Sequence, residues 1–417
     1  MPVTGEVSYA RGNVKEQQSG MWSLADRTRE VAKVGYYSVP LLRYNILAEV
    51  TATSRVGYHR YTFPASEQAA IVVDLQNGGC WDRARETKIE AEGDNRVVGY
   101  RYSSGWARSQ KVYFVAEFSK PFDSFELNNN HYGRLAFKTK EGEQILVKVA
   151  ISPVSVEGAK ANMAAEMPGW PKLKKVARKA EQAWEQELAK AKIQCNDNST
   201  KRIFYTALYH TMIAPSEFCD VDGSYRGADG EVHPNPGHTS YTTYSLWDTY
   251  RAQMPLLSIM HPEKMTGIVN TMLNIFDEQG RLPVWHLWGN ETDCMVGDPG
   301  IPVVADAIVK NIAGFDREKA FEAIKQTAAL AERGKEYRHQ YGYIPCNLFT
   351  EAVAYDMEYA IADGAAANAA KALGKEADYR HFDNMSHSYR IFFDKERGFV
   401  RGVDDKGNFR EPFNPYF

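Results

Sequence analysis

The segment 282–297, LPVWHLWGNETDCMVG, concentrates side chains that suit the binding of a sugar. Its candidate ligand-binding residues are Trp285, His286, Trp288, Asn290 and Glu291. Aromatic rings offer flat apolar faces to the C–H side of a sugar ring, and neighbouring carboxylates and amides can bond its hydroxyls. The residues alone leave a structural alternative open, in which both tryptophans belong to the core and Glu291 caps a surface loop.

A second segment, 240–255, reads SYTTYSLWDTYRAQMP and places Trp247 beside a charged pair. Asp248 and Arg251 are three residues apart in sequence, so on a helix they share a face and can form an ion pair. In the functional interpretation this pair is a fixed polar clamp for ligand hydroxyls. In the structural interpretation it only stabilises the start of a helix.

Two further groups of acidic residues favour ordinary structure. Asp220 and Asp222 resemble the opening of a calcium loop, but the further acidic ligands of such a loop do not follow at the required spacing. The sequence therefore predicts a turn at this point. In the segment 351–363, which we expect to be helical, the default expectation for carboxylates such as Asp356 and Glu358 is that they are solvated.

Residues 1–155 are predicted to form a β-rich domain. Short runs rich in β-branched and aromatic residues, separated by turn signals, indicate an antiparallel β-sandwich. These runs are 45–53, 57–63, 70–75 and 112–118. Glu141 and Gly142 separate two runs with apolar alternation, which predicts a β-hairpin at this turn.

The pattern beyond residue 155 is helical. Apolar residues at steps of three and four begin at Leu173, after Pro168 and Pro171, and predict an amphipathic helix in a linker, 156–199. From 200 to 417 we expect about seven helices, which as successive pairs are typical of an α/α toroid or solenoid. The expected helices are 201–213, 245–260, 262–278, 301–312, 316–333, 351–373 and 375–392.

Composition and motif content argue against several classes of function. Lysine and arginine total 50 against 53 aspartates and glutamates, a net charge of −3, which lacks the basic excess of a nucleic-acid-binding protein. No apolar stretch approaches the roughly 18 residues of a membrane span, and the first residues do not resemble a signal peptide. The 5 cysteines are widely spaced and favour neither a disulfide framework nor a zinc site. Motifs of phosphate-binding loops, zinc peptidases and serine hydrolases do not occur.

Several segments, taken in order along the chain, resemble glycoside hydrolase family 92, the calcium-dependent, exo-acting, inverting α-mannosidases. Earlier ones include LAEVTAT at 47–53, HRYTFP at 59–64, VSVEGA at 154–159 and FYTALYH at 204–210. The most specific are SLWDTYR at 245–251, GNET at 289–292 and MEYA at 357–360. One such motif would be weak support, whereas this many in order make the resemblance strong.

The resemblance implies an N-terminal antiparallel β-sandwich (1–155), a helical linker (156–199) and the N-terminal part of an incomplete (α/α)6 toroid (200–417). It also implies hydrolysis of terminal α-mannosidic linkages in N-glycan or mannan oligosaccharides. In the inverting reaction one carboxylic acid protonates the leaving oxygen, and a second carboxylate activates water on the opposite face of the sugar. A glycan-degrading family further implies a periplasmic, cell-surface or secreted protein.

By this resemblance Trp247, Asp248 and Arg251 match the segment that lines the terminal-mannose subsite, and Glu291 matches an acidic position near the site. The segments expected to carry the catalytic acid and base do not occur up to Phe417, and we expect the calcium ligands beyond it as well. The positions of the acid, the base and the calcium ligands within this chain are therefore unknown.

We accordingly expect this chain to form an incomplete toroid with apolar helix faces exposed, at a cost of about 25 cal/mol per Å². On this expectation it is inactive alone and needs the missing C-terminal half of the toroid as a partner. The sequence leaves two alternatives open. One is a non-catalytic mannose- or glycan-binding protein, and the other is a different glycosidase or a polysaccharide lyase on the same architecture.

Overall fold

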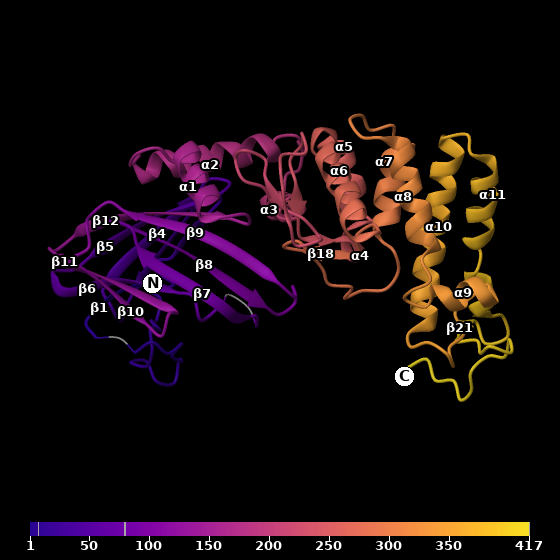
Figure 1. Cartoon of the computed structure of the whole chain (residues 1–417), viewed down its shortest axis with the longest axis horizontal. Helices are drawn as coiled ribbons and strands as arrows, with labels where there is room; N and C mark the ends of the chain where they lie inside the picture. The colour runs from indigo at the N-terminus through magenta and orange to yellow at the C-terminus, as the bar shows by residue number, and fades with distance from the viewer. Residues whose placement is uncertain (7, 79–80, 417) are drawn as a thin grey trace. The chain divides into compact units, whose positions relative to one another are not determined.

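The computed structural model describes residues 1–6, 8–78 and 81–416, and the chain divides into two compact units (Figure 1). The first unit contains Met1–His210, Phe218–Arg226 and Val232–Asn235, and the second contains Thr211–Glu217, Gly227–Glu231 and Pro236–Phe417. The predicted linker thus lies within the first unit. Across the described ranges, no helix has both the length and the apolar character needed to cross a membrane.

Two antiparallel sheets form the body of the first unit. The larger sheet has the strand order β2-β3-β4-β5-β12-β9-β8-β7, and the smaller one has the order β1-β6-β11-β10. The strands are β1 (Pro2–Thr4), β2 (Val31–Lys33), β3 (Tyr36–Leu41), β4 (Ile46–Ala52), β5 (Val56–Phe63), β6 (Ser66–Asp74), β7 (Arg83–Ala91), β8 (Arg96–Ser104), β9 (Gln110–Phe118), β10 (Ser124–Asn128), β11 (Tyr132–Thr139) and β12 (Glu143–Ser152).

The apolar core of this unit lies between the two sheets. On β5, Tyr61 and Phe63 belong to that core, whereas Tyr58 joins a second apolar cluster on the opposite face of the larger sheet. Two helices, α1 (Val156–Glu166) and α2 (Leu173–Leu188), contribute to the second cluster. The larger sheet is therefore covered on both faces, which explains why apolar residues occupy both faces of its central strands.

The turn at Glu141 and Gly142 connects the two sheets, so the predicted hairpin is wrong. Strand β11 pairs with β6 and β10, whereas β12 pairs with β5 and β9. Phe137 before the turn and Ile145 after it are both buried in the core between the sheets. Apolar alternation fits two strands that face each other across a sandwich as well as it fits two strands of one sheet.

Other local predictions in the first unit are confirmed. Helix α2 begins at Leu173, as its periodicity indicated, and α3 (Asn198–His210) follows it. The acidic segment forms the expected turn, because the N–H of Asp220 donates to the carbonyl of Ser224 (2.9 Å) and Asp222 Oδ1 accepts from the N–H of Ser224 (2.9 Å).

The second unit consists of helices that stand side by side around one large apolar core (Figure 1). Helix α10 packs against α7, α8 and α11. The helices are α4 (Leu246–Thr249), α5 (Gln253–Met260), α6 (Pro262–Gln279), α7 (Gly300–Val309), α8 (Arg317–Ala329), α9 (Lys335–Tyr341), α10 (Ala352–Ala372), α11 (Glu376–Met385) and α12 (Tyr389–Phe392).

Short strands accompany these helices. Strands β14 (Tyr225–Arg226) and β15 (Val232–His233) belong to the first unit. Those of the second unit are β13 (Ser216–Glu217), β16 (Tyr241–Thr242), β17 (Tyr244–Ser245), β18 (Trp285–Leu287), β19 (Asn290–Glu291), β20 (Phe393–Asp394) and β21 (Phe399–Val400).

Helix boundaries differ from the predictions at several places. The predicted helix 375–392 is divided into α11 and α12, α8 ends four residues before 333, and α3 begins and ends three residues before the predicted 201–213. The predicted helix 245–260 is broken into α4 and α5, because Pro255 has no N–H to donate to the carbonyl of Arg251 and its ring would clash with that carbonyl. Helix α9 was not predicted. It is only 7 residues long and lies between Gly334 and Gly342, so its sequence shows no extended helical period.

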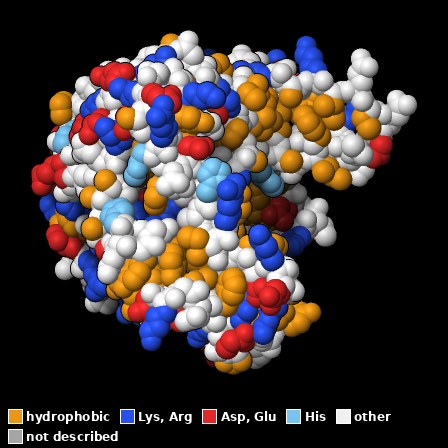
Figure 2. Space-filling model, turned by 90° about the vertical axis from the view of Figure 1, so that its right-hand side faces the viewer, with side chains coloured by type: hydrophobic (Ala, Val, Ile, Leu, Met, Phe, Trp, Pro, Cys, Tyr) orange, Lys and Arg blue, Asp and Glu red, His pale blue; other side chains and the backbone are white. Residues whose placement is uncertain are grey.

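Apolar side chains remain exposed at the end of the helical unit that carries α11 and β21. Figure 2 looks at this end and shows hydrophobic groups scattered among charged ones. Ile391, Phe393, Phe399 and Val400 are 39%, 46%, 47% and 40% exposed. Exposed apolar surface of this kind is expected of an incomplete toroid.

Candidate functional site

A three-stranded sheet brings the two aromatic-rich segments of the sequence together. Strand β17 pairs with β18, which places Tyr244 opposite His286 and Ser245 opposite Trp285. Strand β18 also pairs with β19 through a tight turn at Trp288 and Gly289, whose φ angles are 51° and 72°. Two consecutive positive φ angles match the right-handed twist of a two-residue hairpin.

The residues of this sheet differ in their access to a ligand. Trp285 and His286 are buried, with exposed fractions of 8% and 2%, whereas Trp288 and Asn290 are half-buried. The Trp288 N–H donates to Thr242 Oγ1 (2.7 Å), and Asn290 Nδ2 donates to the Trp288 carbonyl (2.8 Å). The hairpin therefore holds Trp288 in place, while contact of any of these residues with a ligand stays a prediction.

His286 is an unusual core residue. Neither of its ring nitrogens has a hydrogen-bond partner within the described part of the chain. Burial lowers its pKa from 6.5 to about 4, so the ring is neutral at pH 7. The neutral ring supplies no positive charge at pH 7, although one of its nitrogens is a donor and the other an acceptor.

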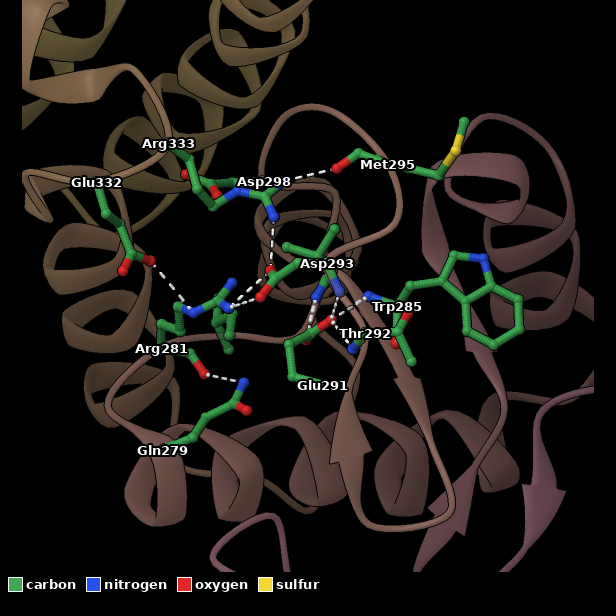
Figure 3. Close-up of polar contacts among 12 residues, drawn as sticks. Gln279, Arg281, Trp285, Glu291, Thr292, Asp293, Met295, Asp298, Glu332 and Arg333 are labelled. Atoms are coloured by element: carbon green, nitrogen blue, oxygen red, sulfur yellow. Dashed lines mark hydrogen bonds and ion pairs between the residues drawn. The ribbon is translucent and has the colours of Figure 1, made fainter. Parts of the chain in front are cut away.

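The carboxylate of Glu291 organises the loop around it (Figure 3). Its Oε1 accepts from the N–H groups of Trp285 (2.8 Å), Thr292 (3.0 Å) and Asp293 (3.0 Å). Its Oε2 accepts from the N–H of Val284 (2.8 Å). Four backbone N–H groups on one carboxylate hold the surrounding loop around this side chain. This geometry suits a loop-organising residue better than a general acid.

Two arginines fix the next acidic residue, Asp293 (Figure 3). Arg281 Nη2 donates to both carboxylate oxygens at 2.7 Å, and Arg333 Nη1 donates to Oδ1 at 2.5 Å. Arg333 Nη2 also donates to the carbonyls of Met295 (2.6 Å) and Gly297 (3.1 Å). The loop is thus held by charge-assisted hydrogen bonds on two sides, and neither arginine was singled out from the sequence.

The predicted pair of Asp248 and Arg251 does not form. Asp248 is exposed on α4 and accepts from Ser245 Oγ (2.5 Å). Arg251 lies beyond the end of α4 and pairs instead with Glu358 of α10. A spacing of three residues brings side chains together only on a continuous helix, and this helix ends at Thr249.

Glu358, which was predicted to be solvated, is largely buried. Its side chain is only 14% exposed. One carboxylate oxygen accepts from Arg251, and the other accepts from the Tyr250 hydroxyl (2.8 Å). Burial and this hydrogen bond raise the pKa of Tyr250, which keeps the phenol protonated as a donor. The sequence did contain one indication that Glu358 has a special role, because it lies in MEYA, one of the segments most specific to the family resemblance.

Asp356 on the same helix is also buried rather than solvated, with an exposed fraction of 0%. It accepts from the N–H of Ile344 (2.8 Å) and from Ser388 Oγ (2.6 Å). Arg338 lies 3.5 Å from it and pairs with Asp363 at 2.6 Å. Burial raises the pKa of Asp356 despite these partners. The partners come from distant parts of the sequence, which is why spacing along one helix could not reveal them.

The residues predicted to bind a sugar lie on connected segments, and their role as one wall of a binding site stays a prediction. Trp247, Asp248 and Arg251 stay partly or largely exposed, and the hairpin with Trp288 and Asn290 is joined to their segment through β17 and β18. An aromatic face, a carboxylate and a guanidinium can bind sugar hydroxyls.

The resemblance implies calcium, so the grouping of possible metal ligands in this chain is relevant. Among the described residues, no three or more His, Cys, Asp or Glu side chains gather where they could hold a metal ion. The described part of the chain therefore does not fit a calcium site built from carboxylates. The expectation that calcium ligands lie outside this chain stays a prediction.

Comparison with solved structures gives close matches. A family GH92 α-mannosidase from Bacteroides thetaiotaomicron is 37% identical with a TM-score of 0.95, and the match covers 99% of this chain and 58% of that one. A structure of that protein in complex with mannoimidazole matches at the same identity and TM-score, and covers 57% of that chain. A family GH92 inverting mannosidase from Bacteroides thetaiotaomicron VPI-5482 is 28% identical with a TM-score of 0.88, at 99% and 57% coverage. This chain therefore spans somewhat more than half the length of these relatives. No curated protein sequence matches it.

The match with these structures confirms the predicted architecture, an antiparallel β-sandwich followed by part of an (α/α)6 toroid. Family models add the assignment. The glycosyl hydrolase family 92 N-terminal domain matches residues 1–152, and the catalytic domain of the same family matches residues 158–417. The chain belongs to glycosyl hydrolase family 92.

Proposed function

We propose that this chain supplies the sandwich and one wall of the mannose-binding site of an α-mannosidase. The whole protein would hydrolyse terminal α-mannosidic linkages in N-glycan or mannan oligosaccharides. The observation that carries this proposal is the arrangement of Trp247, Asp248, Arg251 and the Trp288 hairpin on a fold that matches an α-mannosidase at 37% identity over 99% of the chain. The complex of that relative with mannoimidazole supports a mannoside as the ligand class.

Catalysis in our proposal follows the inverting scheme, in which a general acid and a general base lie about 6.5–9.5 Å apart with room for water between them. The carboxylates of Glu291, Asp293 and Glu358 are already engaged by backbone N–H groups or arginines. We therefore assign neither catalytic role to them and propose that both groups come from the part of the relatives that this chain does not cover. What this chain contributes is the binding and orientation of the terminal sugar.

The proposal also covers the calcium requirement and the cellular location of the whole protein. A calcium requirement is part of the proposal only for a protein that carries further oxygen ligands, because the described residues offer no suitable cluster. Because the proposed substrates are N-glycan or mannan oligosaccharides, we propose a periplasmic, cell-surface or secreted location for the whole protein.

The experiment separates binding from turnover. Residues 1–417 are titrated with mannoimidazole by calorimetry, and hydrolysis of an α-mannobiose is followed with and without calcium. We expect binding without turnover, and we expect Asp248→Ala to weaken binding about 10- to 150-fold, since a hydrogen bond to a charged group contributes about 1.5–3 kcal/mol. Undetectable binding by the unmodified chain would overturn the assignment of the wall. Robust, EDTA-sensitive turnover would overturn the assignment of acid and base to residues outside the chain.

A further inference from the structure

Glu358 lies where three segments far apart in sequence meet. It belongs to α10, and its two carboxylate oxygens accept from two adjacent residues beyond α4, Tyr250 and Arg251. The hydroxyl of Tyr250 is 2.8 Å from Oε2. A carboxylate that accepts one hydrogen bond at each oxygen is held in a single orientation.

The loop 282–297 packs against the side chain of Glu358. Gly297 has a φ of 78°, and a Cβ built on it would lie 2.5 Å from the Cβ of Glu358. The backbone of Gly297 therefore packs directly on the stem of Glu358 and restricts its choice of rotamer. Arg333 holds this backbone in turn by donating to the Gly297 carbonyl at 3.1 Å.

Arg251 makes several side-chain contacts although it is open to solvent. Its side chain is 43% exposed. Its guanidinium carbon lies 4.5 Å from the ring centre of Tyr250 and 5.2 Å from that of Trp247. A partly exposed guanidinium can donate further hydrogen bonds to ligand oxygens.

We propose that Glu358 is a positioning residue, which holds the Arg251 guanidinium ready to meet the hydroxyls of the terminal sugar. This inference rests on the proposed function for the identity of the ligand. A long arginine side chain loses considerable rotamer freedom when a ligand fixes it. Because Glu358 fixes Arg251 before the ligand arrives, that cost is not subtracted from the binding energy.

The first experiment uses no ligand and measures how strongly Glu358 restricts the motion of the Arg251 guanidinium. The arginine side chains are labelled with ¹³C and ¹⁵N, and the guanidinium signal of Arg251 is assigned by its loss in Arg251→Lys. We expect slow rotation of this group in the unmodified chain and fast rotation in Glu358→Gln. Tyr250→Phe, which removes the other hydrogen bond to Glu358, serves as the matched control and is expected to retain most of the ordering. Equal rotation in the unmodified chain and Glu358→Gln would overturn the proposal.

A second arm uses mannoimidazole affinity in a double-mutant cycle. We expect Glu358→Gln to weaken binding roughly tenfold and Arg251→Ala to weaken it at least as much. Since Glu358 acts through Arg251, the double variant should bind no more weakly than Arg251→Ala. Additive losses would mean that Glu358 acts on the sugar independently, which would overturn a positioning role.

The two arms also separate this proposal from the proposed function. If the unmodified chain does not bind mannoimidazole, the proposed function fails, and the rotation of Arg251 still decides whether Glu358 positions it. If binding is normal and Glu358→Gln changes neither rotation nor affinity, the positioning role fails and the proposed function stands.

Discussion

The two units of the chain differ in how they bury charge. In the sandwich unit, an ion pair such as Arg60 with Glu49 leaves the arginine 20% exposed. In the helical unit, Lys335 and Asp298 are both only 3% exposed, and Arg338 and Asp363 are 6% and 7% exposed. Both units have ion pairs between residues distant in sequence, such as Arg55 with Glu166 in the sandwich unit, which are 18% and 15% exposed. The pairs of the helical unit differ because both partners are almost fully buried. One substitution can therefore leave a charge without a partner in the helical unit far more readily than in the sandwich.

The largest effect is expected from Asp298→Ala. This change leaves the Lys335 ammonium buried without a carboxylate partner, in contact with the Thr327 carbonyl (2.6 Å) and the ring of Tyr359 (5.4 Å to its centre). We expect a loss of about 3–5 kcal/mol in the free energy of unfolding of the helical unit, because an uncompensated buried charge is costly. Urea unfolding followed by hydrogen exchange and mass spectrometry resolves the two units.

The control is Glu376→Ala, which breaks an exposed pair with Arg380 (67% and 76% exposed) and should change stability by at most about 0.5 kcal/mol. Equal losses in the two variants would contradict our comparison.

Acid should weaken the helical unit through His286. Its pKa is about 4 in the folded chain and 6.5 without burial, so the unfolded chain binds the proton first as the pH falls. The stability contributed by the neutral ring is complete above pH 6.5 and is lost between pH 6.5 and about 4, by a total of about 3 kcal/mol.

The measurement compares the pH dependence of unfolding for the unmodified chain and His286→Leu, again resolved by unit. In the sandwich, burial also lowers the pKa of His59 to about 4, so that unit should keep its own acid sensitivity in both proteins. A helical unit whose pH profile is unchanged in His286→Leu would rule out this role for His286.

Glu291→Gln tests the loop. The amide keeps the size of the side chain but loses the charge that attracts four backbone N–H groups, so we expect a loss of about 2 kcal/mol. Amide exchange in residues 284–293 should accelerate most, because the donors to Glu291 lie there. Glu376→Gln on the exposed face of α11 is the matched control. Unchanged exchange in the loop would show that Glu291 does not organise it.

The smallest effect is expected from Ile145→Val in the sandwich. Ile145 is fully buried between the sheets, and the removal of one methylene group should cost about 0.5–1.5 kcal/mol. Urea unfolding of the sandwich unit measures this loss. A cost as large as that of Asp298→Ala would remove the distinction between the two units.

Local patterns carried most of the fold prediction. The periodicity from Leu173 indicated α2, and runs of β-branched residues indicated the sandwich. The assignment of strands to sheets was less accessible, because the alternation around Glu141 and Gly142 fits both a hairpin and a crossing between sheets. At α5, the proline was visible in the sequence, and its effect on helix continuity could have been anticipated.

The candidate site was only partly predictable. The aromatic and acidic segments were found by composition, and the β17–β18 pairing does join them. The contact between Arg251 and Glu358 spans 107 positions, so spacing rules that apply within one helix could not detect it. The same reasoning explains why Asp356 was expected to be solvated. Its partners lie in other segments, at Ile344 and Ser388.

The backbone of the loop 282–297 has a consequence for engineering. Trp288 and Asp293 both have a φ of 51°, a conformation that glycine or asparagine adopts at lower cost. A design procedure that optimised thermal stability alone would replace both residues, at a nominal gain of about 1 kcal/mol for each. Such a redesign would remove the carboxylate that Arg281 and Arg333 share and the ring at the tip of the hairpin. Sequence optimisation of this chain should therefore leave these two positions unchanged.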